Sequence, residues 1–171
     1  MQEIRLRPLQ ESDLDALAAN DSPEQDEWNY FGARAVNSLH QQFANNGCIS
    51  EENGTLAVVS PDGMLLGSIG WNEVRHGPSR ACIALNMGIS LLKEHRNQGF
   101  GTAAQRAFPQ YIFSTRLVER IEASTDVENI AEQKALEGAG FTREGILRHA
   151  QFRAGCWRDI VMFSRLRADP A

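Results

Sequence analysis

The stretch from Leu91 to Thr102 contains the residues whose types and spacing best fit a binding chemistry. Its sequence is Leu-Leu-Lys-Glu-His-Arg-Asn-Gln-Gly-Phe-Gly-Thr. An expected strand ends there, a polar turn follows, and a helix begins on Gly99 and Gly101. The first turn of a helix leaves backbone N–H groups without partners, and the helix dipole adds positive potential. Glycine permits a close approach that a side chain would forbid. We therefore expect this turn to bind an anion such as a pyrophosphate.

Two other phosphate-binding patterns fit this turn less well. A Walker A loop, G-x-x-x-x-G-K-[ST], is absent. The dinucleotide fingerprint G-x-G-x-x-A is matched from Gly99 to Ala104, and Glu119 or Glu122 follows about 20 residues later. In that fingerprint, however, the glycines follow directly on a hydrophobic strand, whereas six polar or charged residues, 93–98, intervene here. About 70 residues remain after the turn, too few for the rest of a doubly wound sheet. A helix-capping turn without a ligand is the remaining alternative.

A family resemblance favours another kind of phosphate site. The segment Arg96–Gly101 resembles the Q/R-x-x-G-x-G/A signature of the GNAT acetyltransferases, in which this turn binds the pyrophosphate of coenzyme A. The resemblance extends to the family's opening, to its N-x-A-S…L-E-K-x-G-F helix and to the E-G-x-L-R strand that follows. The matching segments are 5–9, 13–14, 129–141 and 144–148. The most similar subgroup contains the ribosomal-protein N-terminal acetyltransferases (RimJ/RimL-like), and the likeness covers essentially the whole chain.

The resemblance implies a single GNAT acetyltransferase domain over residues 1–171 with an α+β fold. Its central sheet is expected to be mixed and mostly antiparallel, with about six or seven strands flanked by about four helices. The sheet is expected to splay open near the coenzyme.

The hydrophobic pattern predicts where the individual elements lie. Pro109 is expected to kink its helix or to end it early. The expected elements are a strand around residues 4–9, a helix capped by Ser12 with Asp15 three residues later, a helix over about 33–45, strands at 55–60, 64–74 and 81–92, a helix over 99–114, a strand at 118–125, a helix over 129–137, and two strands within 142–166 around a turn at Ala154-Gly155.

The resemblance also assigns the coenzyme contacts, with acetyl-CoA as co-substrate. Backbone groups of the turn are expected to bind the pyrophosphate, while Arg96 shapes the turn. The backbone of Ile89 and Leu91 is expected to pair with the pantetheine arm, and the N–H near Ile89 is a candidate oxyanion donor. Asn129 is expected to contact the coenzyme. It also fits the N-cap of a helix, with Glu132 as the partner three residues later. The turn residues are Gln98, Gly99, Phe100, Gly101 and Thr102.

The chain departs from the family pattern at the positions of the usual acid and base. Asn86 stands where many relatives carry a glutamate; it cannot act as a base, but it can orient a water or the incoming amine. Leu136 stands where many relatives carry a tyrosine that acts as general acid. Glu132 stands where this subgroup often shows serine, and Asn86 and Glu132 are therefore the catalytic candidates.

Several other residues are candidates for the acceptor side. The candidates for a replacement general base are Asp26, Glu27, Glu132 and His40. Each of them also fits a solvated or capping role. Trp28 and Tyr30, beside Phe31, are expected to wall the acceptor pocket together with Asp26 and Glu27, and core packing is the equal alternative.

The missing base suggests which amine is acetylated. The nucleophile must be neutral, which at pH 7 costs about 4–5 kcal/mol for a lysine-like amine and about 1.4 kcal/mol for an α-amine of pKa about 8. An acceptor of low pKa, such as a protein N-terminus, is therefore expected. The alternatives are a small-molecule or antibiotic amine acetyltransferase and, from another class, a non-catalytic acyl-CoA sensor.

Composition limits the partners and the location. The net charge of −5 argues against a nucleic-acid binder. No apolar run approaches the ~20 residues of a membrane span, and the N-terminal residues lack the apolar centre of a signal peptide, so a cytoplasmic protein is expected. The three cysteines, Cys48, Cys82 and Cys156, are widely spaced and indicate neither a disulfide framework nor a zinc site. No metal is expected in the reaction, and homodimers are common among relatives.

Overall fold

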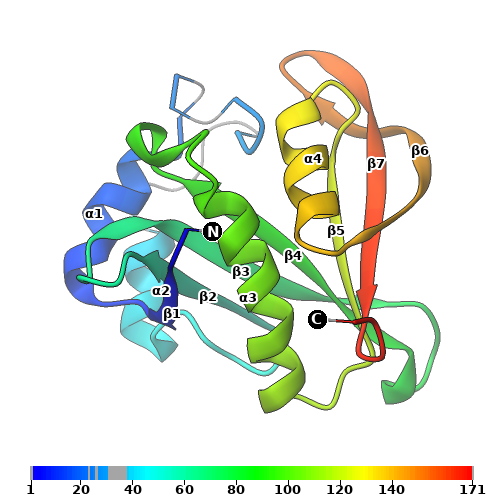
Figure 1. The fold of residues 1–171 in the computed structure, drawn as a ribbon, viewed down its shortest axis with the longest axis horizontal. Helices are drawn as coiled ribbons and strands as arrows, with labels where there is room; N and C mark the ends of the chain where they lie inside the picture. The colour runs from blue at the N-terminus through cyan, green and yellow to red at the C-terminus, as the bar shows by residue number, and fades with distance from the viewer. Residues whose placement is uncertain (1, 23, 26, 31–37, 171) are drawn as a thin grey trace.

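The computed structural model describes residues 2–22, 24–25, 27–30 and 38–170. Figure 1 shows the course of the chain. Its elements are β1 (Arg5–Pro8), α1 (Glu11–Ala19), α2 (Ser38–Asn46), β2 (Asn53–Val59), β3 (Leu65–Arg75), the short 3-10 turn η1 (Arg80–Cys82), β4 (Ile83–Leu91), the 3-10 turn η2 (Lys93–His95), α3 (Phe100–Thr115), β5 (Arg120–Asp126), α4 (Ile130–Gly138), β6 (Thr142–Arg153) and β7 (Cys156–Leu166).

The strands form one mixed sheet. Within the described part of the chain it has seven strands in the order β1-β2-β3-β4-β5-β7-β6. The pairings are antiparallel except for β4 with β5, which is parallel. With the four α-helices of that part of the chain, this confirms the α+β fold, the strand number and the mostly antiparallel character expected from the resemblance.

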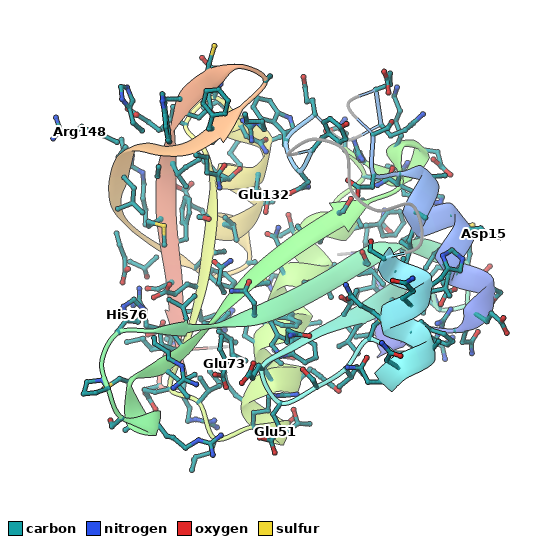
Figure 2. All side chains as sticks on the ribbon, turned by 180° about the vertical axis from the view of Figure 1, so that it is seen from behind. Asp15, Glu51, Glu73, His76, Glu132 and Arg148 are labelled. Carbon is teal, nitrogen blue, oxygen red and sulfur yellow. The ribbon has the colours of Figure 1, made fainter. Side chains whose placement is uncertain are left out.

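Helices cover the two faces of the sheet unequally. The larger core lies under α3 and α4, where Phe108, Ile112 and Leu136 meet inward side chains of the central strands. The smaller core lies on the opposite face, where α1 and α2 pack over β2 through Leu14 and Phe43. Figure 2, the view from behind, shows α2 lying over the β1–β3 half, whereas none of the helices that the structure describes crosses the β5, β7 and β6 half on this side.

Strands β4 and β5 separate partway along their length. They pair at three positions, Leu85 with Ile121, Asn86 with Glu122 and Met87 with Ala123. Beyond Met87, β4 continues to Leu91 paired with β3, and beyond Ala123, β5 continues to Asp126 paired with β7. The result is a fork between 88–91 and 124–126, which confirms the expected splay of the sheet.

One predicted helix boundary is wrong, and the early end considered at Pro109 does not occur. Helix α1 begins at Glu11 after Gln10, not after Ser12. The carboxylate of Asp13 accepts a bond of 2.8 Å from the Gln10 backbone N–H and is itself held by Arg7, so the capping interaction starts two residues earlier. Pro109 does not end α3, which continues to Thr115. Phe108 and Ile112, on either side of Pro109, are buried in the main core, and this packing holds the helix together across the missing hydrogen bond.

The remaining elements lie close to their predicted positions. The third strand of the central stretch begins at Ile83 rather than at residue 81, because η1 precedes it. The hairpin turn between β6 and β7 lies at Ala154 and Gly155, both with positive φ (52° and 79°), the geometry that a two-residue hairpin requires. Residues 33–37 of the second predicted helix lie outside the described residues. None of the helices that the structure describes has the length and apolar character needed to cross a membrane.

Candidate active site

The turn before α3 has a backbone suited to an anion. Asn97 (φ 58°) and Gly99 (φ 85°) are left-handed, and Gly99 is the N-cap of α3. This geometry turns the chain sharply into the helix, so the first N–H groups of α3 point out of its N-terminal end. A hollow of about 540 Å³ lies against this end and is lined by Gln2, Gln98, Gly99, Thr102, Ala103 and Arg106. Three predicted turn residues therefore line one hollow.

The other two predicted turn residues, Phe100 and Gly101, do not line this hollow. Phe100 is half-buried, packs against the main core and stacks edge-on with His95, at a centroid distance of 6.4 Å. A Cβ added to Gly101 would lie 3.7 Å from Leu91 Cδ1, so Gly101 faces the end of β4. Phe100 fixes the first turn of α3 by packing, and Gly101 faces β4 with room for a side-chain methyl group.

Arg96 braces the turn from the inside. Its guanidinium donates to the Leu91 carbonyl from Nε (2.8 Å) and from a terminal nitrogen (2.7 Å). It also donates to the backbone carbonyl of Gln25 and, at 3.4 Å, to Asn20 Oδ1. Arg96 thus ties the turn to the end of β4 and to the segment after α1.

The backbone of β4 presents N–H groups to the fork. Leu92 N donates to Leu66 O on β3 (2.9 Å). Because successive residues of a strand direct their backbone groups to opposite sides, those of Leu91 and Ile89 face away from β3 and toward β5. Their carbonyls accept side-chain donors there: Arg96 at Leu91, and Asn29 Nδ2 at Ile89 (3.2 Å). The two residues predicted to pair with pantetheine therefore line the fork with their backbones.

Asn129 and Glu132 occupy the start of α4. Asn129 is the N-cap, and its Oδ1 accepts a bond of 3.2 Å from the Glu132 backbone N–H. The Glu132 side chain accepts a hydrogen bond from Nε2 of Gln105, a fully buried residue of α3. The capping role of Asn129 is confirmed, and Glu132 spans the gap between α3 and α4.

Asn86 points away from the helices α3 and α4. Its neighbours Leu85 and Met87 lie in the main core, so alternation directs Asn86 to the opposite face. Glu122, its register partner on β5, is directed to the same face because Ile121 and Ala123 are also in that core. The structure thus places Asn86 beside a carboxylate at the root of the fork.

Glu122 belongs to a charged cluster on that face. Its Oε1 accepts from His76 Nε2 (2.6 Å) and from Arg120 Nε (2.7 Å). Arg120 also forms a two-pronged pair with Glu144, which accepts a bond of 2.7 Å from Ser164 as well. The Arg120 guanidinium, assisted by the Ser164 hydroxyl, lowers the pKa of Glu144 to about 2. Figure 2 shows His76 away from Glu132, on the closed side of the fork.

The acceptor-side candidates are only partly brought together. Trp28 and Tyr30 are half-buried and Glu27 is exposed, in the segment that reaches the fork through Asn29. Asp26 lies outside the described residues. His40 instead pairs with Asp15 at 3.1 Å, within the helix layer that covers the β1–β3 half. Its side chain is therefore directed at α1 and not at the fork.

Some residues at the site were missed from the sequence. Asn20 donates to Ser90 Oγ (2.9 Å) and to the Leu91 carbonyl (3.3 Å) from 70 residues away, and Asn29 reaches Ile89 over 60 residues. No local pattern marks either asparagine. Arg106, which lines the hollow, could have been found from its place five residues after Gly101, one to two turns along the same helix.

Comparisons with known proteins agree with this architecture. The chain matches the family described as acetyltransferase (GNAT) domain over residues 3–142. It is 30% identical to the uncharacterized N-acetyltransferase p20 of Bacillus licheniformis over 67% of this chain, and the match spans 62% of that protein, less than two thirds of its length. It is 25% identical to the probable N-acetyltransferase YjcK of Bacillus subtilis (strain 168) over 97% of this chain and 95% of that protein.

Solved structures show the same fold. A spermidine N-acetyltransferase from Vibrio cholerae, crystallised with CoA and spermine, superposes with a TM-score of 0.83 at 20% identity, covering 97% of this chain and 96% of that one. A ribosomal-protein-S5-alanine acetyltransferase from Vibrio fischeri gives a TM-score of 0.74 at 18% identity, over 99% and 96%. At these identities the likeness concerns the fold. The family match, joined to the forked sheet and the turn before α3, confirms that the chain belongs to the GNAT family of acetyl-CoA-dependent N-acetyltransferases.

Proposed function

We propose that this enzyme transfers the acetyl group of acetyl-CoA to a primary amine of low pKa, such as the α-amine of a peptide N-terminus. The observation that carries the proposal is the fork between β4 and β5, which opens beside the turn before α3. The turn offers N–H groups to an anion, and the fork offers N–H groups to an extended amide-bearing arm. A pyrophosphate joined to such an arm fits both.

The coenzyme contacts follow from this placement. The N–H groups of residues 98–102 would bind the pyrophosphate, and Arg106 beside the hollow adds a positive charge. The backbone of Ile89 and Leu91 would pair with the arm as an added strand does. Asn129, at the start of α4, would contact it from the other side of the fork.

The transfer itself needs few side chains. The neutral amine attacks the thioester carbon, the C–N bond forms, the C–S bond breaks as the thiolate leaves, and the proton lost from the nitrogen passes to water or to the departing thiolate. The Ile89 N–H, which faces the fork, would stabilise the oxyanion, and one such donor contributes roughly 3 kcal/mol. A thiol has a pKa of about 8.5, so the thiolate is a tolerable leaving group without a proton donor. The reaction therefore needs no general acid at the position of Leu136, a residue that is 0% exposed within the core.

The carboxylates around the fork already accept hydrogen bonds from side chains of the protein, and this supports an acceptor of low pKa. Asp126 on β5 pairs with Arg153, Glu122 accepts from His76 and Arg120, and Glu132 accepts from Gln105. Asn86, at the usual base position, carries no ionisable group and would orient a water or the amine. An acceptor that is already partly neutral at pH 7 makes the least demand on such a site.

A panel of matched acceptors tests the proposal. We would compare a lysine-free peptide with a free N-terminus, the same peptide with a blocked N-terminus and one internal lysine, spermidine, and an aminated antibiotic, all with acetyl-CoA at pH 7. We expect the free α-amine to be acetylated with a kcat/KM at least about tenfold higher than the lysine side chain. Equal or better turnover of lysine, spermidine or the antibiotic would overturn the acceptor class. Binding of acetyl-CoA without turnover of any amine would indicate a sensor.

A further inference from the structure

We infer that Arg153 is a positioning residue that holds residues 24, 25 and 27–30, here called the strap, across the open end of the fork and so sets the acceptor site. The inference rests on the proposed function in one respect, that the acceptor amine enters at the fork. Figure 1 shows the blue segment after α1 lying between the green turn before α3 and the yellow helix α4.

One side of the strap is fastened to β4 and its following turn. Lys93 Nζ donates to the Glu24 carbonyl at 3.2 Å, and the Arg96 guanidinium donates to the Gln25 carbonyl. Asn29 Nδ2 donates to the Ile89 carbonyl at 3.2 Å. The last of these bonds places the Asn29 carboxamide beside the residue whose N–H faces the fork.

The other side of the strap is fastened to β5 through Arg153, the last residue of β6. Arg153 donates from one terminal nitrogen to the Trp28 carbonyl at 2.7 Å and from the other to Asp126 Oδ2. Its guanidinium also lies over the Trp28 ring, 5.4 Å from the ring centroid. Asp126 ends β5, so Arg153 links Trp28 to that arm of the fork.

Two consecutive residues thus bridge the opening. Trp28 is linked to the β5 side and Asn29 to the β4 side, which fixes the strap above the gap. An amine that enters through the open end of the fork passes or contacts the strap. Neither Trp28 nor Asn29 lines the hollow at the start of α3, so the strap bears on the acceptor rather than on the pyrophosphate.

The pair of Arg153 and Asp126 is built to be rigid. The Arg153 residue is 6% exposed and the Asp126 side chain 1% exposed. Asp126 Oδ1 accepts the Glu128 backbone N–H (2.9 Å), and Arg158 Nε lies 4.0 Å from Oδ2. A planar guanidinium can contact a carboxylate, a carbonyl and a ring face at once, whereas an ammonium cannot keep all three.

This difference provides the test variant. Arg153→Lys keeps a cation beside the buried carboxylate, so Asp126 is not left uncompensated as it would be in an alanine variant. The matched control is Arg158→Lys. Arg158 donates to Glu128 Oε2 at 2.8 Å and not to the strap. Asn29→Ala, at an exposed residue, removes the hydrogen bond that ties the strap to Ile89 on β4. It is a second variant that should loosen the strap.

Hydrogen exchange measures the strap without any acceptor. In Arg153→Lys and in Asn29→Ala we expect the amides of residues 27–30 to exchange about tenfold faster, while residues 98–102 are unchanged. Arg158→Lys should match the wild type. Equal exchange of the strap in Arg153→Lys and the wild type would overturn the inference. Because this readout needs no turnover, it remains decisive even if the proposed acceptor is wrong.

Steady-state kinetics then tests the positioning role. With a lysine-free peptide bearing a free N-terminus, Arg153→Lys should raise the peptide KM about tenfold and leave the Kd for acetyl-CoA within about twofold. Rises of peptide KM and acetyl-CoA Kd by the same factor would indicate a general structural loss and contradict the inference. An unchanged peptide KM with a loosened strap would also contradict it.

Discussion

Asn86 on β4 and Glu122 on β5 are register partners, one residue before the last pairing that joins the two strands. Glu122 Oε1 is held by His76 Nε2 at 2.6 Å and by Arg120 Nε at 2.7 Å. The position at which the family resemblance predicts a base thus carries an amide, and the carboxylate beside it already accepts from two donors. The protonation state of the acceptor amine should therefore govern the rate.

The first prediction concerns the pH dependence of catalysis. For a peptide α-amine, kcat/KM should rise with pH and level off near the pKa of the amine, about 8. Asn86→Glu should increase turnover of lysine-type acceptors by tenfold or more, because repulsion from Glu122 raises the pKa of the new carboxyl toward that of a useful base. Asn86→Gln is the uncharged control. A wild-type profile governed by a group with a pKa well below 7 would show that another residue acts as base.

The second prediction separates a structural from a catalytic role for Glu132. Its carboxylate accepts a hydrogen bond from Gln105 between α3 and α4. In Glu132→Gln the new amide oxygen can accept the same bond, so kcat should stay within about twofold of the wild type. Removal of a general base typically lowers kcat by about 10²–10⁴. A loss of that size at constant Kd for acetyl-CoA would make Glu132 the base.

The third prediction contrasts the two glycines of the turn. Gly99 has φ 85°, so Gly99→Ala should destabilise the protein by about 1–2 kcal/mol and weaken coenzyme binding. Gly101 begins the regular helix, and its added Cβ would meet Leu91 Cδ1 at an ordinary 3.7 Å. Gly101→Ala should therefore be neutral or stabilising by up to about 1 kcal/mol, with CoA affinity retained. Urea unfolding and calorimetry with CoA measure both quantities, and the reverse order of the two variants would refute the role given to Gly99.

The fourth prediction concerns acid stability. Arg120 holds the pKa of Glu144 at about 2, below its ordinary value, so this pair stabilises the fold at neutral pH and the stabilisation is lost as pH falls from about 4.5 toward 2. The Glu144 side chain is 40% exposed, so solvent screening limits the effect to about 1 kcal/mol. Urea unfolding of Glu144→Gln should show this deficit at pH 7 and a smaller one at pH 3. Glu51→Gln, at a pair whose side chains are 90% and 82% exposed, is the control and should show no deficit at either pH. A Glu144→Gln deficit that is constant with pH would contradict the ion-pair origin.

The sequence predicted those features that depend on local pattern. The turn at 96–102, the N-cap at Asn129 and the hairpin at Ala154-Gly155 each rest on residues close in the chain, and all three elements lie where expected. The start of α1 differs from the prediction because Ser12 is the better capping residue by type, whereas the helix has Gln10 as its N-cap. The Gln10 backbone instead bonds to Asp13, which Arg7 holds from the preceding strand.

The parts of the site that could not be predicted depend on contacts between distant segments. Arg153 bonds to the Trp28 carbonyl across 125 residues, and a backbone acceptor leaves no trace in the sequence. The sequence alone indicates for Glu122 only a possible ribose contact in a dinucleotide fold. Its place beside Asn86 follows from the register of the parallel pair, which no pattern within either strand specifies.

The most direct test of coenzyme binding is a map of backbone amide chemical shifts during titration with CoA. The largest changes should fall on Ile89, Leu91 and residues 98–102, since their N–H groups line the fork and the start of α3. No saturable change, or changes centred instead on the separate hollow lined by Gln42 and Trp71, would contradict the assignment of the fork and the turn as the coenzyme site.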